Sequence, residues 1–281
     1  MPDPIPPVVD ADTLARLQAA REVVLADVRW TLDGSEGEAT YLAGHLPGAV
    51  FVDLATILSG PGAPTDGRHP LPDAARFAAG LGGLGIGEDV TVVAYDQSGG
   101  ASAGRLVWLL RVLGQPAALL DGGLRAWRGP LEPGAARRLP VTRQVVPWPA
   151  ARFADADEVA RLARDPAAVV VDARAAARYR GEVEPIDPRA GHVPGAVNVP
   201  VDDNLAADGR LLDEAALTGR WAAAGVFDAD EVVAYCGSGV NAALDLLVLE
   251  HLGRPGMLYV GSWSGWSADP DRPAATGTEP G

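Results

Sequence analysis

The only cysteine of this 281-residue chain lies where an apolar run ends and a glycine-rich loop begins. The segment reads Val233-Ala-Tyr-Cys236-Gly-Ser-Gly-Val-Asn-Ala242, and a second apolar run follows it. This order predicts a strand, a loop over Gly237 to Asn241, and a helix. A thiol in such a loop faces unpaired backbone N–H groups and the positive end of a helix dipole, and both favour the thiolate. The pattern therefore indicates a nucleophilic cysteine, although an inert buried cysteine is the alternative.

Other chemistries that a cysteine can serve lack their partner residues. A cysteine-dependent phosphatase needs an arginine six residues after the nucleophile, where this chain has Ala242. A redox pair needs a second thiol, and a zinc site needs clustered ligands rather than one cysteine and four scattered histidines. A GxxxxGK[ST] phosphate loop is excluded because the chain contains no lysine. Covalent catalysis by one activated thiolate remains.

The chain is an internal duplication. Asp10 to Arg29 aligns without a gap with Asp155 to Arg174, and nine of these twenty paired positions are identical. A repeat of well over 100 residues predicts tandem domains rather than a solenoid. Three further segments repeat in the same order: Gly44 to Val50 with Gly191 to Val197, Val92 to Tyr95 with Val232 to Tyr235, and Gly122 to Trp127 with Gly261 to Trp266.

The two halves differ at the position that matters for chemistry. Asp96 stands in the first half where Cys236 stands in the second. A carboxylate cannot replace a thiolate in sulfur chemistry, so only the second half can react. His45 and His192 lie in the repeated Gly-His-x-Pro-Gly-Ala turns of both halves, which favours a structural role for them.

Each half is predicted to be an α/β domain with a parallel sheet flanked by helices. The apolar runs Val23 to Asp27 and Ala168 to Asp172 lack strict alternation, as strands buried on both faces do. We expect a domain without the thiol over 1–128, a proline-rich linker over 129–150, a catalytic domain over 151–269 and a disordered tail over 270–281.

The composition limits the partners of the chain. A net charge of −14 argues against nucleic acid or an anionic membrane as a partner. No run of 18 apolar residues is present, so no membrane-spanning helix is expected. A single cysteine cannot form an intrachain disulfide, which is consistent with a cytoplasmic location.

Together these features resemble the rhodanese family from about Val8 to Trp266. The loop Cys236-Gly-Ser-Gly-Val240 is similar to that of the 3-mercaptopyruvate branch, whereas the thiosulfate branch carries Cys-Arg-Lys-Gly-Val. The resemblance implies a sulfurtransferase that moves sulfur from the small molecule 3-mercaptopyruvate, through a persulfide on the cysteine, to a thiol, thioredoxin or cyanide. It implies no metal or organic cofactor. A thiosulfate:cyanide sulfurtransferase and a protein-to-protein sulfur relay are the alternatives.

The resemblance also implies which residues carry the chemistry. Cys236 matches the nucleophile, and Ser238 matches a serine that works with a histidine, here His69. An acidic residue usually completes this group, but Ala55 stands at the best-aligned position and Asp53 lies two residues earlier.

Donor binding is expected to depend on arginine and on the loop. Arg178 matches the arginine that holds the substrate carboxylate, which a guanidinium meets with two parallel hydrogen bonds. Arg189 matches a second arginine, and Arg180 is the fallback. The loop N–H groups would bind first the thiolate and then the persulfide anion, as an anion nest. Its expected members are Gly237, Gly239, Val240 and Asn241, where Asn241 replaces the usual Thr or Ser.

Overall fold

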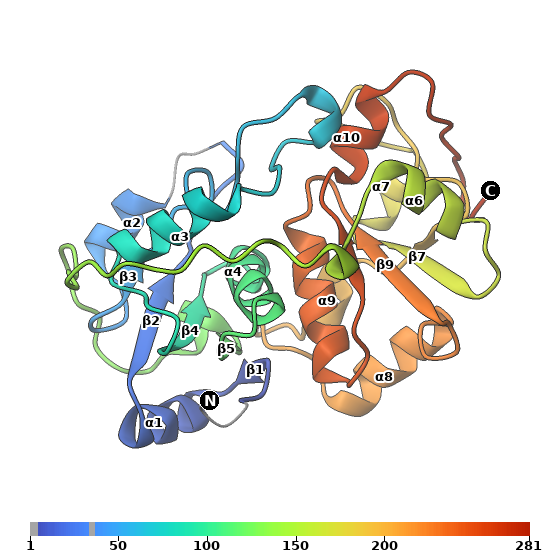
Figure 1. Cartoon of the computed structure of the whole chain (residues 1–281). Helices are drawn as coiled ribbons and strands as arrows, with labels where there is room; N and C mark the ends of the chain where they lie inside the picture. The colour runs from blue at the N-terminus through green and yellow to red at the C-terminus, as the bar shows by residue number, and fades with distance from the viewer. Residues whose placement is uncertain (1–4, 34–36) are drawn as a thin grey trace. The chain divides into compact units, whose positions relative to one another are not determined.

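The computed structural model describes residues 5–33 and 37–281, which form two compact units (Figure 1). The first unit contains Met1–Gly60, Leu71–Pro149 and Ala206–Leu211. The second contains Pro61–Pro70, Ala150–Leu205 and Leu212–Gly281. The units therefore exchange two short segments, and the loop that bears His69 belongs to the unit that bears Cys236.

The first unit has a five-stranded parallel sheet in the order β1-β5-β4-β2-β3. Its strands are β1 (Val8–Val9), β2 (Val23–Asp27), β3 (Val50–Phe51), β4 (Thr91–Tyr95) and β5 (Ala117–Leu120). Its helices are α1 (Ala11–Ala20), α2 (Glu38–Ala43), α3 (Ala74–Gly83), α4 (Ala101–Val112) and α5 (Gly123–Ala126).

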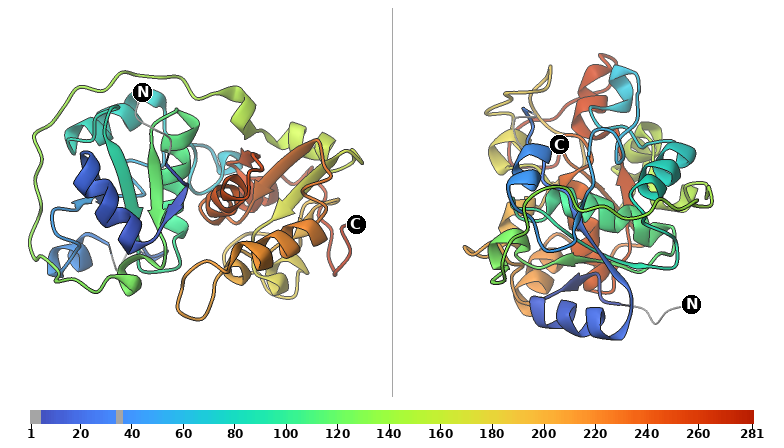
Figure 2. Two further views of the ribbon diagram at one scale, coloured as in Figure 1. Left: turned by 90° about the horizontal axis from the view of Figure 1, so that it is seen from below. Right: turned by 90° about the vertical axis from the view of Figure 1, so that its left-hand side faces the viewer.

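The second unit repeats this topology in the order β6-β10-β9-β7-β8, again with all strands parallel. Its strands are β6 (Phe153–Ala154), β7 (Ala168–Asp172), β8 (Val197–Asn198), β9 (Glu231–Tyr235) and β10 (Met257–Tyr259). Its helices are α6 (Ala156–Leu162), α7 (Ala176–Tyr179), α8 (Glu214–Ala223), α9 (Asn241–His251) and α10 (Ser262–Ala268), with the 3₁₀ turns η1 (Pro64–Asp66), η2 (Ala150–Arg152) and η3 (Val201–Asn204). Both views in Figure 2 show helices packed along the sheets. The α/β prediction and the duplication are confirmed.

A buried Asp-x-Arg pair fixes the repeated turn in each unit. Arg174 forms an ion pair with Asp172 at 2.6 Å and donates to the carbonyl oxygen of Gly191 at 2.7 Å. In the first unit, Arg29 makes the same contacts with the carboxylate of Asp27 and with the Gly-His-x-Pro-Gly turn. Both charges are paired and hydrogen-bonded, as buried charges must be. The pair therefore ties a strand end to the turn that follows it.

The turn histidines also have structural contacts. His192 Nδ1 donates to the carbonyl oxygen of Tyr179 at 2.8 Å, and the two rings stack at 3.7 Å. His45 Nδ1 hydrogen-bonds to the carbonyl oxygen of Glu132. These contacts support the structural role expected for both histidines.

One hydrophobic cluster of the second unit lies between its sheet and the helices α6 and α10. Side chains alternate along a strand, so Val233 and Tyr235 of β9 face this cluster together. Helix α9 packs against β9 and β10 and follows the cysteine loop directly. The other members of the cluster are Ala154, Val159, Leu162, Val170, Val193, Ala196, Tyr259, Trp263 and Trp266.

The linker and the tail are both held by backbone hydrogen bonds. The linker is an extended segment without regular secondary structure that runs beside α3 in the first unit (Figure 1). The N–H of Val141 in the linker donates to the carbonyl oxygen of Gly82 at 2.9 Å. The disorder expected of residues 270–281 is not observed. Ala275 exchanges backbone hydrogen bonds with His192, and the carbonyl oxygen of Pro280 accepts from the N–H of Gly195 at 2.7 Å. In the part of the chain that is described, no helix has the length and apolar character needed to cross a membrane.

Candidate active site

Cys236 is at the carboxyl end of β9, in the loop that leads into α9. Its sulfur accepts hydrogen bonds from the N–H of Gly239 at 3.1 Å and from the N–H of Ser238 at 3.4 Å. Gly239 has a φ of +76°, which other residues adopt only with strain, and this turn aims its N–H at the sulfur. The cysteine is 3% exposed. The sulfur therefore sits in a cradle of backbone donors suited to a thiolate.

The start of α10 fixes the backbone of the cysteine loop. The N–H of Trp263 donates to the carbonyl oxygen of Cys236 at 2.9 Å, and that of Ser264 donates to Gly237 at 3.0 Å. The hydroxyl of Ser262 accepts from the N–H of Cys236 at 3.2 Å and donates to Tyr259 at 2.9 Å. Ser262 has a φ of +51°, and no other non-glycine residue among those described has a positive φ. Backbone strain of this kind is concentrated at functional sites.

The first unit has the same cradle, filled by a carboxylate. Asp96 follows β4, and its two side-chain oxygens accept four backbone N–H bonds, from Ser98, Gly100, Ser102 and Ala103 at 2.8–3.2 Å. Complete burial raises the pKa of Asp96, and the four N–H bonds oppose this shift. The first unit therefore keeps an anion-binding loop but has no nucleophile there.

His69 and Ser238 lie together in the second unit. His69 Nδ1 is 2.8 Å from the Ser238 hydroxyl, and both side chains are nearly buried. The loop that carries the histidine is docked on α10. A Cβ on Gly67 would lie 2.4 Å from the carbonyl oxygen of Gly261, and the N–H of Arg68 donates to the hydroxyl of Ser264 at 3.1 Å. Ser238 thus combines an N–H on the sulfur with a hydroxyl held by the histidine.

Two arginines approach the loop next to the cysteine. A Cβ on Gly237 would lie 2.9 Å from Nη2 of Arg68 and 3.4 Å from Nη1 of Arg178. The absence of a side chain at Gly237 leaves room for both guanidinium groups. Arg178 was predicted from the sequence, whereas Arg68 was missed. Two sequence features could have indicated Arg68. It is adjacent to His69, and in a chain without lysine an arginine must supply any permanent positive charge at the site.

Buried carboxylates pair with these arginines. Arg178 forms ion pairs with Glu184 at 2.6 Å and with Asp187 at 2.9 Å. Arg68 also contacts Asp187, through the other carboxylate oxygen. Glu184 lies 3.4 Å from Arg174, the arginine of the repeated Asp-x-Arg pair. The cations beside the cysteine loop are therefore already neutralised within the protein.

The guanidinium of Arg189, predicted as the second substrate arginine, is bound to the end of α10. Its guanidinium donates to four carbonyl oxygens at the end of α10 and beyond, at 2.7–3.0 Å, those of Trp266, Ser267, Asp269 and Arg272. Carbonyl groups at the end of a helix lack intrahelical donors, and the guanidinium of Arg189 donates its N–H groups to them. Arg180, the fallback, forms an ion pair with exposed Glu182 at 2.7 Å. These bonds favour a structural role for Arg189, and its role in donor binding stays a prediction.

The remaining expected residues lie at the start of α9 and in the segment that follows β3. Val240 is buried as the residue before α9, and Asn241 is the first residue of that helix. Ala55 is exposed, and the carboxylate of Asp53 accepts from the N–H of Thr56 at 2.7 Å. Among the described residues, no three His, Cys, Asp or Glu side chains group to hold a metal ion.

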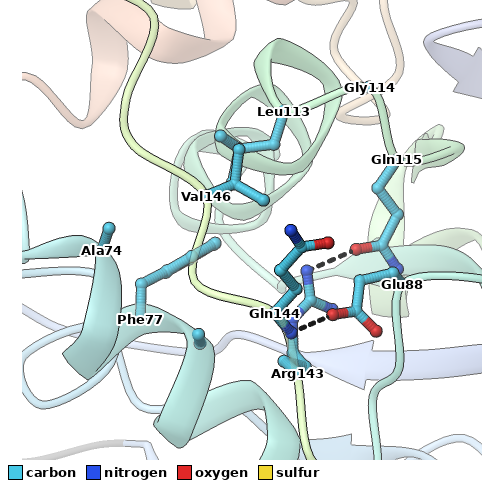
Figure 3. A pocket seen from close by; sticks show the side chains of 10 residues that line it. Ala74, Phe77, Glu88, Leu113, Gly114, Gln115, Arg143, Gln144 and Val146 are labelled. Atoms are coloured by element: carbon cyan, nitrogen blue, oxygen red, sulfur yellow. Dashed lines mark hydrogen bonds between the residues drawn. The ribbon is translucent and has the colours of Figure 1, made fainter.

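A separate cavity of about 120 Å³ lies in the first unit (Figure 3). Three of its polar side chains are hydrogen-bonded: Arg143 donates to Gln115 at 2.8 Å, and Glu88 accepts from the backbone N–H of Gln144. It contains no thiol or hydroxyl group, so we assign it no chemistry. Its other lining residues are Ala74, Phe77, Ala78, Leu113, Gly114 and Val146.

The Rhodanese-like domain family matches the chain twice, over residues 10–129 and 155–269. The chain therefore belongs to the rhodanese family and carries two of its domains. This confirms the family resemblance that the sequence motifs indicated.

Its relatives carry names from two branches of that family. The chain is 44% identical over 276 residues to "Probable 3-mercaptopyruvate sulfurtransferase" of Pseudomonas aeruginosa, with 95% of this chain and 97% of that protein covered. It is 41% identical over 289 residues to "Putative thiosulfate sulfurtransferase SseB" of Mycobacterium tuberculosis, with 95% and 96% covered. The solved structure "3-mercaptopyruvate sulfurtransferase from Leishmania major" is similar at a TM-score of 0.82 and 30% identity, with 95% of this chain and 75% of that chain covered.

Proposed function

We propose that the chain is a sulfurtransferase that takes sulfur from 3-mercaptopyruvate through a persulfide on Cys236. The observation that carries this proposal is the sulfur of the only cysteine, held by two loop N–H groups beside two guanidinium groups. Backbone N–H groups of this kind can stabilise sulfur anions, and guanidinium groups can hold an anionic donor beside them, at the same edge of the sheet. The names of the relatives support the same reaction class.

The first half-reaction forms the persulfide. The thiolate attacks the sulfur of the donor, an S–S bond forms, and the C–S bond breaks with its electron pair leaving on the pyruvate enolate. The proton of the transferred S–H then neutralises the enolate, which gives pyruvate and a persulfide anion. The N–H groups of Ser238 and Gly239 would stabilise that anion as they stabilise the thiolate.

The pair formed by His69 and Ser238 has a role in the same step. The hydroxyl lies 2.8 Å from the imidazole, in a loop where the next N–H contacts the reactive sulfur. We assign Ser238 the hydrogen bond to the carbonyl oxygen that becomes the enolate oxygen, with His69 orienting the hydroxyl. Stabilisation of developing charge by a fixed donor is a large source of catalysis.

The second half-reaction returns the thiolate. A thiophile such as cyanide, a small thiol or a reduced thioredoxin attacks the outer sulfur, and the S–S bond breaks with its electron pair on Cys236. The scheme calls for no metal and no organic cofactor.

We further propose that the protein acts in the cytoplasm. We propose domain limits of 1–128 and 151–269, with residues 129–150 as the linker.

Thiosulfate is the second candidate donor, because one of the relatives is named for it. The loop segment Gly237-Ser238-Gly239 carries no charge, but Arg68 and Arg178 approach it and are paired with acidic residues. A dianion would add two uncompensated charges there, whereas mercaptopyruvate adds one that is remote from its sulfur.

Turnover assays with both donors and a cyanide acceptor test the proposal. We expect sulfur transfer from mercaptopyruvate by the wild type and none by Cys236→Ser, because a hydroxyl forms no persulfide. Full turnover by the variant would refute the mechanism.

A further inference from the structure

The carboxylate of Asp187 lies between the two guanidinium groups that approach the cysteine loop. One of its oxygens contacts Arg68, and the other accepts from Arg178 at 2.9 Å. The side chain is 3% exposed. Among the described residues, these are the two guanidinium groups that approach Gly237, next to the cysteine. A donor carboxylate bound there would therefore need the same pair of cations.

We propose that Asp187 determines donor affinity by occupying the cationic subsite of Arg68 and Arg178, so that a donor carboxylate binds in competition with it. This inference rests on the proposed function and adds a specificity-determining residue to it. The occupant it predicts is a small monoanionic carboxylate.

The balance of charge supports competition. The guanidinium groups of Arg68, Arg174 and Arg178 face three carboxylates, those of Asp172, Glu184 and Asp187. With all six groups ionised the cluster is neutral before a donor arrives, and an added anion would leave one negative charge uncompensated. An uncompensated charge in a poorly solvated site is costly. Release of one internal carboxylate removes that excess.

The two carboxylates that contact Arg178 differ in their other bonds. Glu184 accepts backbone N–H bonds from Ile186 at 3.1 Å and from Asp187 at 3.0 Å, so it closes the loop on itself. Burial raises the pKa of Glu184, but the hydrogen bonds from Arg178 and these N–H groups outweigh it and lower the pKa overall. Glu184 is thus a structural residue of the loop.

Asp187 has no comparable backbone bond among those found in the described residues, and its carboxylate contacts only arginine. Burial raises its pKa, and nearby Glu184 adds to the rise, while Arg68, Arg178 and Arg174 oppose it. Protonation of this carboxyl would free the two guanidinium groups. Donor binding is therefore expected to weaken as the pH rises through the titration of Asp187.

The first test measures binding without turnover. Pyruvate serves as the monoanionic probe in the Cys236→Ser background, with its Kd measured by calorimetry. We expect Asp187→Asn to lower the Kd by about tenfold, because the amide leaves both guanidinium groups without a competing charge. Glu182→Gln, which removes an exposed carboxylate paired with Arg180, is the matched control and should leave the Kd unchanged.

A second arm uses Arg68 and pH. Adding Arg68→Gln to the Asp187→Asn variant should reverse most of the gain in affinity. The Kd of the Cys236→Ser protein should rise with pH, and Asp187→Asn should remove that dependence. The pH profile of the Cys236→Ser protein tests the proposal even if the Asp187 variant folds poorly, because that protein keeps Asp187. An unchanged or weaker Kd in Asp187→Asn, or a flat pH profile with Asp187 present, would overturn the proposal.

Turnover separates this inference from the proposed function. If the wild type forms no persulfide from mercaptopyruvate, the proposed function fails while the pyruvate measurements still decide the role of Asp187. If the wild type turns over and Asp187→Asn shows an unchanged or raised KM, only the inference fails.

Discussion

Replacement of Arg178 by alanine tests the donor-binding part of the site. The guanidinium lies beside Gly237 and holds Glu184 and Asp187 at 2.6 and 2.9 Å. Loss of one charge-assisted hydrogen bond to a donor carboxylate costs about 1.5–3 kcal/mol, which corresponds to a KM roughly 10- to 150-fold higher. The donor carboxylate is remote from the reacting sulfur, so kcat should change by less than about threefold.

The fold should survive this change because both carboxylates keep another arginine. Glu184 remains near Arg174, and Asp187 remains in contact with Arg68. We expect a loss of about 1–2 kcal/mol in the free energy of unfolding, below the cost of an unpaired buried charge. A urea titration at the assay temperature measures it.

Steady-state kinetics with mercaptopyruvate at saturating cyanide measure the functional effect. Arg180→Ala is the control, because Arg180 is paired with exposed Glu182 at the surface. Its KM should stay within about twofold, since exposed pairs contribute little. A folded Arg178→Ala protein with the wild-type KM would refute the assignment.

Three further predictions follow from the same geometry. His69→Asn should lower kcat about 10- to 100-fold with a smaller change in KM, because Ser238 loses its orienting partner; equal kcat values would remove His69 from the mechanism. Asp96→Asn should lower the free energy of unfolding by about 2–4 kcal/mol, because an amide nitrogen would face two N–H donors while the loss of the buried charge offsets only part of that cost; urea unfolding measures it, and persulfide formation at Cys236 should be unaffected in the folded variant. Mercaptopyruvate should exceed thiosulfate in kcat/KM by at least about tenfold, since a dianion adds two charges to a neutral cluster; equal values would leave only the reaction class standing.

Local pattern was enough to predict the thiol site. The run into Cys236, the glycines after it and the apolar helix beyond it describe a strand, an anion-binding turn and a helix, and all three form. The apolar runs without strict alternation predicted the parallel sheets. The repeat predicted the tandem domains and the position of Asp96, because it aligns Asp96 with Cys236.

The contacts of the donor-binding arginines could not be predicted from local sequence pattern. Asp187 and Arg68 are 119 positions apart, and their contact depends on a loop that docks on α10 through Gly67. Arg189 bonds to backbone carbonyl groups, which every residue carries and no sequence pattern marks. The same reason explains the ordered tail, where Pro280 and Ala275 are held through backbone groups.

The most direct test of the central claim is the mass of the cysteine peptide. The protein is incubated with mercaptopyruvate without an acceptor, and the peptide that contains Cys236 is analysed by mass spectrometry. We predict a gain of about 32 Da, the mass of one sulfur, which cyanide removes with formation of thiocyanate. An unmodified Cys236 peptide in a protein that still releases pyruvate would contradict the persulfide mechanism.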